Sequence, residues 1–145
     1  MKAGPAMIAW ISCPLALAIH DRQLAEHGGA GGVRDETLLD SALARSQQLH
    51  AYGPPPPDLA ASLAFGLARN HPFVDGNKST AHVCYRVFLK LNGCDLRASD
   101  EEKYASMIGL ADGTIGEAEF AQWLCACIAA DIPDSVQEPA TPYRR

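Results

Sequence analysis

The sequence lacks several features that mark well-known classes of protein. Its five cysteines are an odd number with no CxxC pair, so neither a disulfide framework nor a zinc site is indicated, and we expect reduced thiols that pack as small apolar groups. Positive charge is scarce: 12 Lys and Arg face 17 Asp and Glu, for a net charge of -5. Without a basic stripe, a direct nucleic-acid binder is not expected. No internal repeat is visible.

Long apolar runs are missing as well. The amino-terminal stretch has a faint resemblance to a signal peptide, but Pro5, Ser12 and Pro14 interrupt it well below the length of a membrane span. We therefore expect a cytoplasmic protein without a membrane partner. The interrupted stretch instead predicts a short strand at Ile8–Ile11 followed by a helix.

What is present is typical of one globular domain. Hydrophobic residues make up 48% of the 145 positions and charged residues 20%, which suffices for a single core. Prolines and polar residues accumulate after Asp131, so we expect a domain over 1–131 and a disordered tail over 132–145.

Apolar residues recur at helical spacing almost throughout, so the sequence predicts a compact all-α bundle of about six helices. Each predicted helix has a capping or turn signal near its start. These signals are Pro14, Asp35, Asp58, the motif loop before Asn77, Ser99 with Glu102, and Thr114 with Glu117.

The residues that carry chemistry form the run His-Pro-Phe-Val-Asp-Gly-Asn-Lys at 71–78, between two predicted helices. His71 is a candidate general base for a hydroxyl. Asp75 offers a hard oxygen ligand for Mg²⁺. Gly76, Asn77 and Lys78 open the next helix, where free N–H groups and a positive charge favour a phosphate. We expect Phe73 to anchor the loop in the core, and His20 and His82 to be packing or surface residues.

This run resembles the signature of the Fic/Doc family, and lysine after the asparagine is its Doc-type form. The resemblance extends over about residues 8–130 and includes Ala18–Asp21, Val33–Asp35 and Phe88–Gly93. It implies a Fic/Doc-type helical bundle with a flap near 50–53 that docks the target.

The resemblance also implies an activity. His71 would activate a target hydroxyl, Asp75 would hold Mg²⁺, and Gly76, Asn77 and Lys78 would bind the phosphates of ATP. A Doc-type protein is the toxin of a toxin–antitoxin module: it phosphorylates elongation factor Tu, arrests translation and is neutralised by a Phd-type antitoxin. AMP transfer in the Fic manner and a non-catalytic homologue that binds the antitoxin remain alternatives.

One residue departs from the family pattern. Doc-type sequences carry arginine directly after the lysine, whereas this chain has Ser79. A neutral hydroxyl replaces a bidentate, charge-assisted phosphate contact, which weakens phosphate binding. Either the activity is attenuated, or a cation such as Arg69 or Arg86 compensates, or the substitution was introduced so that a toxic protein could be produced.

Overall fold

The computed structural model describes residues 7–129, and this part of the chain contains six helices and no strand. The all-α prediction is therefore confirmed. The predicted domain end at 131 and the tail over 132–145 lie outside the described residues. No helix within 7–129 is both long and apolar enough to cross a membrane. The helices are α1 (Cys13–His27), α2 (Glu36–His50), α3 (Pro56–Asn70), α4 (Asn77–Leu91), α5 (Asp100–Asp112) and α6 (Glu117–Ala129).

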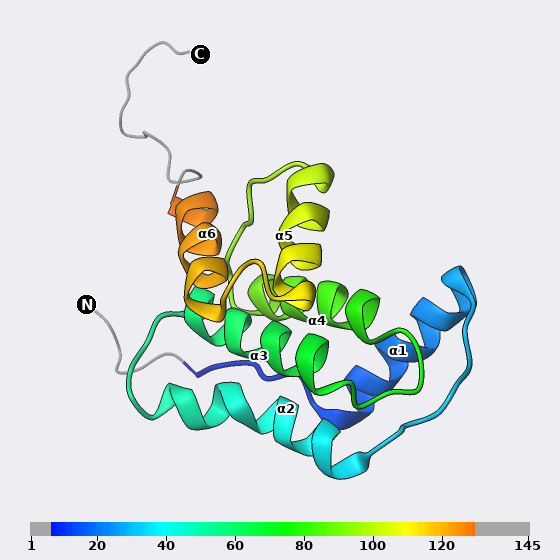
Figure 1. Cartoon of the computed structure of the whole chain (residues 1–145). Coiled ribbons are helices and arrows are strands. Elements are labelled where there is room, and N and C mark those ends of the chain that lie inside the picture. Colours follow the sequence, from blue (N-terminus) through cyan, green and yellow to red (C-terminus); the bar gives the residue numbers. More distant parts are fainter. Residues whose placement is uncertain (1–6, 130–145) are drawn as a thin grey trace.

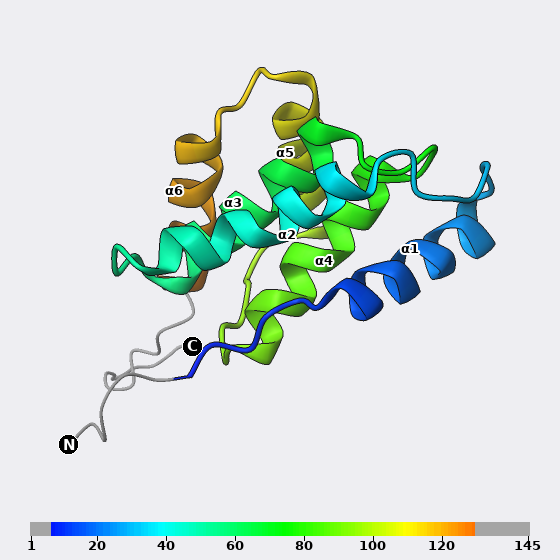
Figure 2. The same cartoon turned by 90° about the horizontal axis from the view of Figure 1, so that it is seen from below.

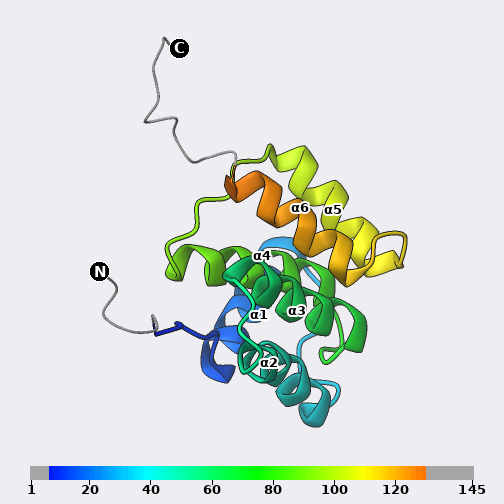
Figure 3. The same cartoon turned by 90° about the vertical axis from the view of Figure 1, so that its left-hand side faces the viewer.

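The six helices pack in three layers. The pair α3 and α4 lies in the middle, with α1 and α2 on one side and α5 and α6 on the other (Figures 1 and 3). The connection between α1 and α2 passes beside the connection between α3 and α4 (Figures 1 and 2). The two loops at this end of the bundle form the candidate site.

Helix α3 is the centre of the core. Ten of its 15 residues are buried, on all sides of the helix, because it contacts α2, α4, α5 and α6. Small residues allow this close approach: a Cβ added at Gly66 would lie only 3.1 Å from the Cα of Ala42 on α2. The motif loop starts directly at the end of this helix, so its first residues are attached to the most constrained part of the fold.

The strand predicted at Ile8–Ile11 is wrong. The segment 7–12 is not part of any helix or strand, and the side chain of Asn92 pairs with the backbone of Ala9 at its centre. The Ala9 N–H donates to Asn92 Oδ1 at 2.9 Å, and Asn92 Nδ2 donates to the carbonyls of Ala9 (2.9 Å) and Phe88 (2.8 Å). One side-chain amide thus does locally what a neighbouring strand would do.

Two of the predicted helix starts are confirmed in detail. Asp35 Oδ1 accepts from the Leu38 N–H at 3.1 Å at the start of α2. Ser99 and Glu102 form a reciprocal capping box at the start of α5. Both pairings join residues three apart in sequence, so they can be recognised without knowing the fold.

Two other predicted caps are wrong. Helix α3 starts at Pro56 rather than after Asp58, because prolines suit a first turn that needs no N–H donors. Thr114 does not cap α6. Its hydroxyl and its N–H both bond to Asp112 Oδ1, at 2.7 and 2.9 Å, and Glu119 accepts from the Gly116 N–H at the helix start.

We predict that Asn92→Ala lowers the free energy of unfolding by about 1–3 kcal/mol, because it removes three hydrogen bonds and leaves partly buried backbone groups unpaired. Urea unfolding followed by circular dichroism measures the change. Substitution of the exposed Gln47 on α2 by alanine is the control and should change stability by less than about 0.5 kcal/mol. Equal effects of the two substitutions would contradict the proposed role of Asn92.

Candidate functional site

The motif loop begins with an unusual backbone conformation at His71. This residue ends α3 in the left-handed region, with φ 52° and ψ 57°, and is the one described non-glycine residue with positive φ. Pro72 follows and prevents the helix from continuing. The His71 side chain is exposed. The left-handed turn thus directs the candidate base out of the helical layer, at some cost in backbone strain.

Phe73 anchors the loop, as predicted. Its side chain is 1% exposed and its ring stacks on that of His20, with centroids 3.8 Å apart and planes at 8°. Asn77 closes the loop around it: the Phe73 N–H donates to Asn77 Oδ1 at 2.8 Å, and Asn77 Nδ2 donates to the Phe73 carbonyl at 2.9 Å. The Asn77 side chain therefore holds the loop in place. The backbone N–H of Asn77, at the uncapped start of α4, is the group of this residue that remains for a phosphate.

The glycine-rich connection between α1 and α2 pairs with the motif loop. The Arg34 N–H donates to the Pro72 carbonyl at 2.7 Å and the Val74 N–H donates to the Gly32 carbonyl at 3.1 Å, which makes an antiparallel bridge between Val33 and Phe73. Two segments about 40 residues apart in sequence thus share one short backbone ladder. The conformation of the loop depends on both.

The Arg34 side chain completes this pairing. Its Nε donates to the His71 carbonyl at 2.7 Å and its Nη2 to the Asn70 carbonyl at 3.0 Å. The last carbonyls of a helix lack intrahelical donors and carry partial negative charge, so a guanidinium is a suitable cap. Arg34 therefore fixes the backbone from which the candidate base projects.

Asp75 is held from two directions. Its Oδ2 accepts from the Ala30 N–H at 2.7 Å, and its carbonyl accepts from His20 Nε2 at 2.8 Å. A Cβ on Gly29 would come within 3.1 Å of the Asp75 Cβ, at a φ of +118°, so this close approach needs glycine. The carboxylate is exposed and its position is well defined.

The donor set around Asp75 fits Mg²⁺ with phosphate better than an all-protein metal site. Among residues 7–129 no group of three or more His, Cys, Asp or Glu side chains could hold a metal ion. Mg²⁺ is commonly held by one or two carboxylates together with substrate phosphates and water. A single oriented carboxylate beside a helix amino end matches that pattern.

The amino end of α4 opens onto a cavity of about 440 Å³. Gly76 is the N-cap, with φ 81° and no side-chain cap, so the first N–H groups of the helix remain available to an anion. Lys78 is exposed, and the Ser79 hydroxyl donates to the Gly76 carbonyl at 3.4 Å. The cavity is lined by Gln23, Glu26, His27, Lys78, Ser79, His82, Val83, Arg86, Tyr104 and Met107.

Arg69 and the predicted flap lie elsewhere. The Arg69 guanidinium is 5.1 Å from the centre of the Phe65 ring, which Arg45 also covers at 4.9 Å, and Arg69 does not line the cavity at α4. Residues 50–53 precede α3, whereas His71 follows it, so about 20 Å of helix separates them. The segment beside the motif loop is 29–34.

His20, Ala30 and Arg34 support the site, yet their contacts were not predicted. His20, expected to be a packing or surface residue, is 2% exposed and packs on Phe73. All three contact residues 36 to 55 positions away, and no local pattern reveals such pairs. The one available signal was that residues 18–21 and 33–35 share in the family resemblance.

His82 lies in the cavity wall in an environment that disfavours its charged form. Burial, followed by the charges of Arg86 and Lys103, lowers the pKa of His82 from 6.5 to about 4, against a smaller opposing effect of Asp100. Its buried Nδ1 has no hydrogen-bond partner among the described residues. His82 is therefore neutral in the folded protein near pH 7.

We predict that His82 makes the protein less stable in mild acid. Because the folded pKa is depressed, the unfolded chain takes up the proton first, and folded stability falls as pH decreases from 6.5 towards 4. His82→Gln should flatten this part of the profile, measured as the unfolding free energy at several pH values. The same substitution at exposed His50 is the control. Parallel profiles for wild type and His82→Gln would contradict the prediction.

Comparison with known proteins agrees with this geometry. The sequence profile of the Fic/DOC family matches residues 10–89, more than half of the chain. "Protein kinase doc" of Escherichia phage P1 is 32% identical over 104 residues, which cover 70% of this chain and 76% of that protein. "Toxin Doc" of Mycolicibacterium smegmatis is 49% identical over 75 residues, covering 49% of this chain and 57% of the relative. With all six helices and the motif loop in place, the chain belongs to the Fic/DOC family.

Proposed function

We propose that this chain is the toxin of a toxin–antitoxin pair and transfers the γ-phosphate of ATP to a hydroxyl of a target protein in the cytoplasm. The observation that carries the proposal is the motif loop. Its backbone is tied to residues 30–34 and to Asn77, and the loop leaves His71 exposed at the end of α3. The names of the two relatives, a toxin and a protein kinase, support the same conclusion.

The residues of the loop have distinct roles in this reaction. His71 removes the proton from the target hydroxyl, whose oxygen then bonds to the γ-phosphorus while the bond from that phosphorus to the β–γ bridging oxygen breaks and ADP leaves. The α4 amino end, with Gly76, the Asn77 N–H and Lys78, binds the phosphate oxygens. Asp75 would hold Mg²⁺, which neutralises charge on the phosphates when bound.

The proposed partners rest on the family resemblance. We propose elongation factor Tu as the target and a Phd-type antitoxin as the neutralising partner. The cavity at the amino end of α4 includes the apolar side chains of Val83 and Met107 among its lining residues. Co-expression with an antitoxin encoded next to the gene, followed by co-purification, tests the second partner.

One experiment separates this function from its alternatives. The purified chain is incubated with ATP, Mg²⁺ and elongation factor Tu, and the mass of the target is measured. A gain of one phosphoryl group supports the proposal, and a gain of one AMP group assigns the Fic-type reaction instead. An unmodified target together with a stable antitoxin complex would identify a non-catalytic binding protein.

We predict that His71→Asn abolishes target modification and leaves the fold intact. Asparagine tolerates the left-handed backbone found at this position but cannot act as a base near neutral pH, so a loss of at least about 100-fold in rate is expected. The melting temperature checks the fold. Gln47→Asn, at an exposed position on α2, is the control and should retain full activity. Undiminished modification by His71→Asn would remove His71 from the mechanism.

A further inference from the structure

The cavity at the amino end of α4 contains an arginine from the same helix. Lys78, Ser79, His82 and Arg86 follow one another at helical spacing along one face of α4 and all line the cavity. Arg86 lies two turns beyond Ser79. The rise of 1.5 Å per residue places their Cα atoms about 10 Å apart along the axis.

The Arg86 side chain is turned back towards the start of the helix. Its Nε donates to the His82 carbonyl at 3.0 Å, in keeping with the tilt of helical side chains towards the amino end. The guanidinium therefore lies closer to Ser79 along the helix axis than the Cα atom of Arg86 does. This hydrogen bond uses Nε, so both terminal nitrogens can form a fork for two oxygens of an anion.

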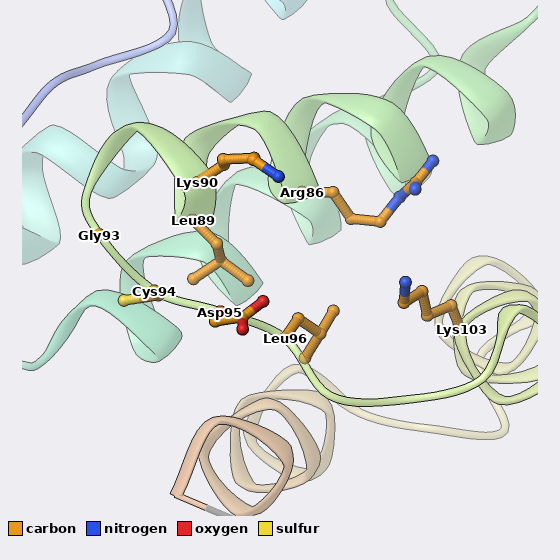
Figure 4. A pocket seen from close by; sticks show the side chains of 8 residues that line it. All are labelled: Arg86, Leu89, Lys90, Gly93, Cys94, Asp95, Leu96 and Lys103. Carbon is orange, nitrogen blue, oxygen red and sulfur yellow. The ribbon is translucent and has the colours of Figure 1, made fainter. Parts of the chain in front are cut away.

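Positive charge gathers around Arg86 although the chain as a whole is acidic. Arg86 also borders a second cavity, of about 480 Å³, whose lining includes Lys90 and Lys103 (Figure 4). In this view the amino group of Lys103, from α5, points towards the guanidinium, and the Asp95 carboxylate lies on the other side of the cavity. Burial is the main cause of the lowered pKa of His82, and the charges of Arg86 and Lys103 lower it further against the opposing charge of Asp100.

The other candidate cation is engaged elsewhere. Arg69 lies over the Phe65 ring, together with Arg45, which pairs with Glu117 at 3.0 Å. Of the two arginines that the sequence leaves open as substitutes for the missing charge at position 79, Arg86 is the one that shares a cavity with Ser79.

We propose that Arg86 supplies the guanidinium contact to the nucleotide phosphates that Ser79 cannot make. This inference rests on the proposed function, since it assumes a polyphosphate whose end lies on the amino end of α4. The phosphate chain then runs along the α4 face, from the free N–H groups and Lys78 towards Arg86. A charge lost at the first turn is replaced from two turns further along the same helix.

The affinity of the full-length protein for ATP with Mg²⁺, measured by titration calorimetry, tests this inference. Arg86→Gln is expected to weaken binding by at least about 10-fold, because a charge-assisted fork becomes a neutral amide. Lys90→Gln is the control: it removes a positive charge one turn away that lines the second cavity but not the first. It should change affinity by less than about 3-fold. Melting temperatures confirm that each variant is folded.

A second pair of variants tests whether Arg86 takes the place of an arginine at position 79. Ser79→Arg should tighten binding by less than about 3-fold in the wild-type background, where Arg86 already provides the contact, but by at least about 10-fold in the Arg86→Gln background. Equal gains in both backgrounds would overturn the role of Arg86. Weakened binding in Arg69→Gln, with Arg86→Gln unaffected, would overturn it and assign the role to Arg69.

The remaining outcomes separate this inference from the proposed function. If the wild type binds ATP and Arg86→Gln binds it equally well, the inference is wrong and the proposed function stands. If the wild type does not bind ATP but Ser79→Arg does, Arg86 does not compensate and the enzyme is an attenuated one. If neither protein binds ATP or modifies the target, both the inference and the proposed function are wrong.

Discussion

The burial of Phe73 against His20 is the contact on which the candidate site depends. A loop that leaves the central helix needs hydrogen-bond partners for its backbone groups, and two of these partners, Asn77 and His20, contact Phe73 directly. Asn77 encloses the Phe73 backbone from the following helix, while His20 stacks on the ring and also bonds to the Asp75 carbonyl. One buried aromatic ring thereby links α1, the motif loop and α4.

The position of this loop in the bundle explains how exposure and order are combined. His71 follows α3, ten of whose 15 residues are buried, so this candidate base projects from the end of a well-packed helix while its side chain stays exposed. The carbonyl end of α3 is capped by Arg34, and the amino end of α4 is left without a side-chain cap. The two helix ends that meet at the site therefore differ. The partial negative charge at the end of α3 is neutralised by Arg34, whereas the N–H groups at the start of α4 remain available to an anion.

Local sequence patterns predicted most of the helices and two of their caps. The spacing of apolar residues was sufficient for six helices, and the caps at Asp35 and Ser99 involve neighbours in sequence. The prediction at Asp58 was wrong because prolines alone could start α3, and the strand at 8–11 was wrong because the Asn92 amide, more than 80 residues away, satisfies that backbone. Asn77 was predicted to open α4, as it does, whereas the two bonds between its side chain and the Phe73 backbone were not predicted.

The bond between Asp75 and Ala30 has a consequence for communication within the fold. The carboxylate proposed to meet Mg²⁺ is also the acceptor for a backbone N–H of the α1–α2 connection, so any ligand that withdraws electron density from that carboxylate weakens the Ala30 hydrogen bond. The exchange rate of a single backbone amide, 45 residues before the carboxylate in the chain, then becomes an internal reporter of occupancy. The glycine-rich connection would in this way respond to a ligand at the proposed nucleotide site.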